Sequence, residues 1–177
     1  MVFSKRQREL FSETDLFNEV HESNHLEIKP ELLRDWQKRL SIYQSKLFKG
    51  ESKSPSQASL FNNQELSPIE SFNPLSLTPL PINFWRLSTN PYQGPAIYIV
   101  MDRPEGLDTP ILLYIGETIA AEKRWKGEHD CKAYLSAYVQ ALVKAGAKNK
   151  LSIRFWTDVP RATKARRSIE QQLIQLW

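Results

Sequence analysis

Two apolar runs stand out in the hydrophobic pattern of the chain, residues 96–101 (AIYIVM) and residues 111–116 (ILLYIG). Both are rich in Ile, Val and Tyr, which suit a buried β-strand. Residues 102–110 between them contain two prolines and a glycine, which interrupt a strand and favour a loop. The pattern predicts an antiparallel hairpin, in which Tyr98 and Tyr114 can lie side by side on one face.

The periodicity after the hairpin predicts two helices, a strand and a last helix. Residues 119–125 favour a short helix that ends before Gly127, and residues 132–145 favour a longer one. Residues 151–157 alternate between apolar and polar side chains, as in a half-buried strand, and residues 161–177 carry a helical apolar stripe. The order β-β-α-α-β-α predicts an α+β domain with a small three-stranded antiparallel sheet flanked by helices.

A helix is also predicted for residues 30–49, because Pro30 suits a first helical position and Gly50 suits the end. Its apolar residues recur at helical spacing: Leu33, Trp36, Leu40, Tyr43 and Leu47. We expect this stripe, including the two aromatic residues, to pack against the later domain or against a partner protein.

Residues 51–83 are rich in Ser, Asn, Gln and Pro and predict a linker whose apolar end lies along the folded domain. The predicted organisation is a helical N-terminal extension (1–50), a partly docked linker (51–83) and a sheet domain (84–177). The sequence stops on an apolar helical turn without a capping residue, a pattern expected of a domain cut short.

With 41% hydrophobic and 25% charged residues, the composition is that of a soluble globular protein. No apolar run approaches the ~18 residues of a membrane span, and the first residues lack a signal peptide core, so we expect a cytoplasmic protein without a membrane partner. The single cysteine, Cys131, excludes an internal disulfide. From Lys144 to Arg167 there are eight basic residues and one acidic residue, which indicates either a phosphate-facing surface or a solvated helix and loop.

The tripeptides Ala96-Ile97-Tyr98 and Tyr114-Ile115-Gly116, followed by Glu122-Lys123-Arg124-Trp125, resemble the GIY-YIG nuclease superfamily. The resemblance covers roughly the last half of the chain. It implies a domain that opens with the hairpin, continues with an arginine-bearing helix and places a metal-binding glutamate on a late helix. Arg124 and Glu170 stand at those positions. The implied activity is an endonuclease that hydrolyses phosphodiester bonds in DNA with Mg²⁺ or Mn²⁺.

The chemistry of phosphodiester hydrolysis gives each of these residues a role. Glu170 is the expected metal ligand, since one carboxylate is enough for Mg²⁺, which keeps most of its waters. Arg124 is expected to hold the scissile phosphate, because a guanidinium stays charged and fits phosphate geometry. In similar nucleases the first tyrosine acts as the base and the second supports it. Those roles fall to Tyr98 and Tyr114, although a phenol needs nearby cations to act as a base. His129 is the other candidate for a base or proton relay.

The chain departs from the family pattern in four places. The family often has a His or Tyr four residues beyond the arginine, whereas this chain has Glu128 there and His129 next, and either can turn inward. Ala96 replaces the first glycine, which a strand tolerates. Glu117 stands where the DNA-repair excinuclease branch carries lysine, which argues against that branch. The late asparagine of the family would lie beyond Trp177.

A nucleic-acid-binding surface is predicted from basic residues near these positions: Lys123, Lys126, Lys150, Arg154, Lys164, Arg166 and Arg167. DNA is the expected partner, with branched and damaged DNA among the forms to consider. The competing hypothesis is a nucleic-acid-binding module that keeps the fold without turnover.

A third hypothesis is a zinc peptidase, because His21, Glu22 and His25 form an H-E-x-x-H pattern. That motif requires a helix, and the neighbouring Ser23 and Asn24 favour a turn instead. We interpret the pattern as a coincidence.

Overall fold

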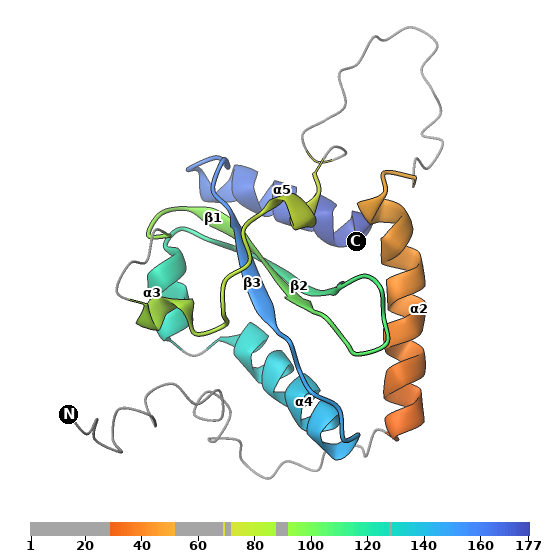
Figure 1. The fold of residues 1–177 in the computed structure, drawn as a ribbon. Helices are drawn as coiled ribbons and strands as arrows, with labels where there is room; N and C mark the ends of the chain where they lie inside the picture. The colour runs from red at the N-terminus through yellow and green to blue at the C-terminus, as the bar shows by residue number, and fades with distance from the viewer. Residues whose placement is uncertain (1–28, 52–68, 70–71, 88–91, 128) are drawn as a thin grey trace, which may run out of the picture.

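The computed structural model describes residues 29–51, 69, 72–87, 92–127 and 129–177. Its centre is a three-stranded antiparallel sheet in the order β2-β1-β3 (Figure 1). The strands are β1 (Ala96–Asp102), β2 (Ile111–Thr118) and β3 (Ser152–Trp156). The predicted hairpin is therefore confirmed, and so is the α+β class with helices around the sheet.

Helices cover both faces of this sheet (Figure 1). One face packs under α3 (Ala121–Lys126), α4 (Asp130–Lys144) and the single turn η3 (Phe84–Arg86). The other face packs against α5 (Thr163–Leu176), whose Leu173 is fully buried among strand residues. Because side chains alternate along a strand, Tyr98 and Val100 point to the first face, and Ile97 and Ile99 to the second.

Helix α2 (Pro30–Phe48) packs along the free edge of β2, where it forms one upright side of the molecule in Figure 1. Its contact with the edge is polar. The Gln44 side-chain amide donates to the Leu112 carbonyl at 3.1 Å, and its oxygen accepts from the Leu112 N–H at 2.7 Å. Ser41 shares a hydrogen bond with Thr109. The amide of Gln44 thus takes the place that a neighbouring strand would occupy.

Trp36 and Tyr43 contact the later domain, Trp36 edge-on against Tyr138 and Tyr43 through a hydrogen bond to the Leu176 carbonyl, but neither is buried in the contact face of the helix. The buried positions are Leu33, Gln37, Ser41 and Gln44, whereas Trp36 is 40% exposed and Tyr43 is 50% exposed. The physical reason is that a strand edge presents unpaired N–H and C=O groups, which amide and hydroxyl side chains satisfy and apolar ones do not.

The segment before the hairpin covers the other edge of the sheet. Leu80 forms a single antiparallel bridge with Ile153 on β3, with N–H···O distances of 2.8 and 2.9 Å in the two directions. Phe72 stacks on Trp156 nearby. A further turn, η2 (Pro74–Ser76), begins with Pro74, and the Asn73 side chain caps it. Both sheet edges are therefore covered by residues that precede the sheet in sequence.

The H-E-x-x-H residues and the rest of residues 1–28 lie outside the described residues. Within the described ranges, no helix has the length and apolar character needed to cross a bilayer.

Candidate active site

Tyr98 lies directly over Gly116, its register partner on β2. A Cβ atom at Gly116 would be 2.8 Å from Cε2 of Tyr98 and closer still to Cζ and Oη, well inside ordinary contact distance. Only glycine leaves room for the ring. The rings of Tyr98 and Tyr114 then stack with centroids 6.0 Å apart and planes 10° from parallel. This close approach of the Tyr98 ring explains why residue 116, the last residue of the second tripeptide, is glycine.

Both phenols are protonated at neutral pH. Burial raises the pKa of Tyr98 well above its usual range, and the neighbouring Cys131 and Tyr114 act in the same direction. Burial also raises the pKa of Tyr114, and the neighbouring Cys131 acts in the same direction. The pair is therefore better suited to donate hydrogen bonds to an anion than to accept a proton.

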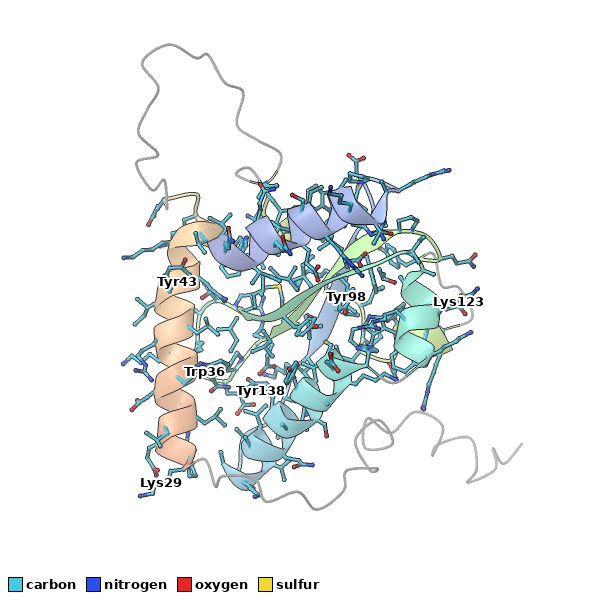
Figure 2. The ribbon with its side chains drawn as sticks, turned by 180° about the vertical axis from the view of Figure 1, so that it is seen from behind. Lys29, Trp36, Tyr43, Tyr98, Lys123 and Tyr138 are labelled. Atoms are coloured by element: carbon cyan, nitrogen blue, oxygen red, sulfur yellow. The ribbon has the colours of Figure 1, made fainter. Side chains whose placement is uncertain are left out.

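Helix α3 places Arg124 beside these phenols. Its anchor is Trp125, which is fully buried and meets Tyr98 edge-on at 5.6 Å between centroids. Trp85 stacks on the same indole at 6.0 Å. Because Trp125 is held in this way, the adjacent Arg124 stays at the surface near Tyr98, where its positive charge opposes the rise in the Tyr98 pKa that burial causes. Figure 2 shows Tyr98 of β1 in the interior of the molecule. Lys123 of α3 lies on the outside, across the molecule from α2.

Glu170 reaches the site from α5, on the other face of the sheet. Its Oε1 accepts a hydrogen bond from the backbone N–H of Glu117 at 3.0 Å, at the end of β2. Burial raises the pKa of Glu170, the Glu117 carboxylate adds to that effect, and Arg167 and Arg124 oppose it. The Glu170 carboxylate also contributes to the raised pKa of Tyr114. Glu170 therefore interacts electrostatically with groups on both sides of β2.

His129 precedes α4 and packs edge-on against Trp125, with ring centroids 4.9 Å apart. It is only 9% exposed, and neither ring nitrogen has a hydrogen-bond partner in the described part of the chain. Burial lowers its pKa to about 4, and the charges of Arg124 and Lys132 act in the same direction. His129 is therefore a neutral imidazole at pH 7. Glu128, the alternative, lies outside the described residues.

The residues present fit a weakly held Mg²⁺ or Mn²⁺ rather than a dedicated cage. Among the described residues, no three His, Cys, Asp or Glu side chains gather into a metal-binding group. Glu170 offers one half-buried carboxylate whose Oε2 accepts no hydrogen bond from the described residues. One carboxylate suits Mg²⁺, which keeps several waters and takes phosphate oxygens as further ligands.

Two members of the predicted nucleic-acid-binding surface are not at the surface. Arg154 is 7% exposed and donates to the Leu77 carbonyl, to Ser152 and to the Met101 sulfur. Arg166 is fully buried. Neither guanidinium is accessible to a phosphate, so that prediction is wrong for both. The exposed members of the set are Lys123, Lys126, Lys150, Lys164 and Arg167.

The sequence interpretation missed the role of Glu117, which is joined to α5 by three contacts. Arg166 Nε donates to Glu117 Oε2 at 2.8 Å, and Arg167 Nε donates to Oε1 at 3.2 Å. The third contact is the backbone hydrogen bond to Glu170. Arg166, Glu170 and the buried Leu173 recur at helical spacing, and that spacing could have indicated that Arg166 faces inward.

Comparison of the chain with protein-family models finds no match, and comparisons with curated proteins and with solved structures find no match either.

Proposed function

We propose that this protein is a divalent-metal-dependent endonuclease that hydrolyses phosphodiester bonds in DNA. The observation that carries the proposal is geometric. Tyr98 and Tyr114 stack with centroids 6.0 Å apart, and Trp125, the neighbour of Arg124, packs on Tyr98 at 5.6 Å. Glu170 is hydrogen-bonded to Glu117, which directly follows the Gly116 that Tyr98 covers. A cation, two phenols and a carboxylate thus act on one region at the edge of the sheet. Hydrolysis of a phosphodiester needs these kinds of groups, because negative charge develops on the phosphoryl oxygens and on the leaving oxygen.

In this proposal Arg124 binds the scissile phosphate. Arg124 is exposed, and its position is set by the buried Trp125 next to it in α3. A guanidinium held in this way can pair with two phosphate oxygens at once. Tyr114, which is protonated and partly exposed, donates a hydrogen bond to the phosphate or to the attacking water, and the buried Tyr98 stacks against Tyr114 and supports it.

His129 is the base in this proposal, in preference to Tyr98. A base must be unprotonated before the reaction, and the raised pKa of Tyr98 keeps its proton in place at neutral pH, whereas His129 is neutral. Both ring nitrogens of His129 are buried, so substrate binding must uncover one of them before it can accept the proton of the attacking water. Glu170 would hold the Mg²⁺ or Mn²⁺, which when bound supplies positive charge for the phosphoryl and leaving oxygens.

The test is conversion of supercoiled plasmid to nicked circles in Mg²⁺ or Mn²⁺, with EDTA as the metal-free arm. We expect nicking by wild type and a loss of at least ~100-fold in Glu170→Gln and in Arg124→Met, as for removal of one charged transition-state contact. Lys144→Ala is the matched surface control, because Lys144 is exposed at the far end of α4. Absence of nicking by wild type, or equal nicking by Glu170→Gln, would refute the proposal.

A nucleic-acid-binding module without turnover is the second candidate, favoured by the exposed cations Lys123, Lys164 and Arg167 on the helices that carry Arg124 and Glu170. It predicts salt-sensitive DNA binding without nicking. Because Arg166 is buried, the informative variant replaces Lys123, Lys164 and Arg167 together. We place either activity in the cytoplasm, where both would have access to DNA.

A further inference from the structure

A buried arginine connects the first turn of α5 to the end of β2. Arg166 is fully buried, and its guanidinium is nearly saturated with partners. Nε donates to Glu117, Nη1 donates to the carbonyls of Pro160 and Arg161, and Nη2 lies 3.4 Å from the Thr163 hydroxyl. A fully buried arginine with this many directed bonds specifies the position of whatever it binds, because each bond would be lost if the partner moved.

The residue it binds is Glu117, and the backbone of Glu117 holds Glu170. The Glu117 carboxylate is shared between Arg166 and Arg167, while the Glu117 N–H donates to Glu170 Oε1. Arg166 and Glu170 lie one turn apart on α5, so the helix supplies both the cation that fastens Glu117 and the carboxylate that Glu117 orients. The result is a closed loop of contacts through a single residue of β2.

The two arginines also decide which carboxylate is open. Glu117 and Glu170 are near enough to repel each other, and a metal ion placed between two free carboxylates would be drawn to both. Because each oxygen of Glu117 is bonded to an arginine, the negative charge of Glu117 is compensated by the two guanidinium groups. Glu170 keeps one oxygen that the described residues leave without a hydrogen bond.

We propose that Arg166 and Glu117 are positioning residues, which fasten the end of β2 to α5 so that the Glu117 N–H aims the carboxylate of Glu170 toward Arg124 and a bound divalent cation. This inference rests on the proposed function for its purpose, but the hydrogen bond itself can be measured in the metal-free protein. The partners that orient a metal ligand typically change metal affinity by ~10–100-fold when they are removed.

The experiment compares wild type with Glu117→Gln and Arg166→Met in two measurements. The first is hydrogen exchange of the Glu117 backbone amide by NMR in EDTA. The second is the affinity for Mn²⁺ alone, followed by electron paramagnetic resonance of the free ion. Glu117→Gln keeps the backbone N–H and one carbonyl oxygen for Arg166, so it serves where Arg166→Met fails to fold. Arg161→Met is the matched control, since it removes a neighbouring exposed cation without touching Glu117.

We expect faster exchange of the residue-117 amide and at least ~10-fold weaker Mn²⁺ binding in both variants, with neither change in Arg161→Met. Unchanged exchange together with unchanged Mn²⁺ affinity would overturn the positioning role. That conclusion would hold even if the variants had lower thermal stability than wild type.

The same experiment separates this inference from the proposed function. If wild type binds no Mn²⁺ and nicks no plasmid, the endonuclease proposal fails, while the exchange measurement still decides whether Arg166 and Glu117 hold Glu170. If wild type nicks plasmid and the variants match it in both measurements, the endonuclease stands and the positioning role fails.

Discussion

Replacing Gly116 with alanine tests the central packing relation of the candidate site. The new methyl group would lie about 0.6 Å closer to Cε2 of Tyr98 than ordinary van der Waals contact allows, and it would overlap Cζ and Oη by more. The ring cannot move aside, because Tyr98 is 1% exposed and is enclosed by Tyr114 and Trp125. Overpacking of a well-packed core costs about 1–3 kcal/mol, and with three ring atoms in conflict we expect a value near 3 kcal/mol.

The assay is urea unfolding followed by circular dichroism, with two partner variants. In a Tyr98→Ala background the ring is gone, so adding Gly116→Ala should cost less than about 0.5 kcal/mol, and the difference measures the coupling. Gly94→Ala is the matched control, since no atom lies within 4 Å of a Cβ at that position. Equal costs of Gly116→Ala with and without the Tyr98 ring would refute the reasoning.

Three further predictions follow from buried polar groups. Because the pKa of His129 is lowered to about 4, folding disfavours its protonated form, and the free energy of unfolding falls as pH drops below 6.5. Between pH 7 and pH 5 the expected loss is about 2 kcal/mol. His129→Leu should flatten this pH dependence in urea titrations. Gln44→Ala leaves the edge of β2 without its amide partner and should cost about 1–3 kcal/mol, against nearly nothing for the exposed Gln171→Ala. Tyr138→Phe removes the 2.7 Å hydrogen bond to the buried Asp102 and should cost a similar amount in thermal unfolding, with Mn²⁺ affinity unchanged.

The order of elements could be predicted because it depends on local pattern. The runs around Tyr98 and Tyr114 are β-branched and aromatic, and prolines and glycine interrupt them, so a hairpin is the natural outcome for these residues. The helical stripe of residues 161–177 likewise follows from spacing alone. In these segments the periodicity of apolar residues and the final packing agree.

The positions that could not be predicted depend on contacts between distant residues. Gln44 is buried because it pairs with Leu112, 68 residues later, and nothing in the helix sequence marks it as a substitute strand. Helical spacing with Leu173 indicates the inward side of α5, but the full burial of Arg166 depends on the Glu117 carboxylate of β2 and on two backbone carbonyls before α5. An arginine in a basic run is normally solvated, and only the three-dimensional arrangement provides the anion that draws this one inward.

The polar covering of both sheet edges bears on how the chain folds as it leaves the ribosome. Gln44 and Leu80, which close the two edges, are synthesised before any of the three strands. The residues that cover the edges are therefore already present when each edge strand is synthesised. The last edge strand, β3, pairs with the centre of the sheet and with Leu80 as soon as it emerges, so it spends little time with open backbone groups exposed to other chains. A shortened chain that starts at residue 84 would lack both covers. Its strands would emerge with both edges bare, and we expect it to self-associate during synthesis at concentrations where the full chain stays dispersed.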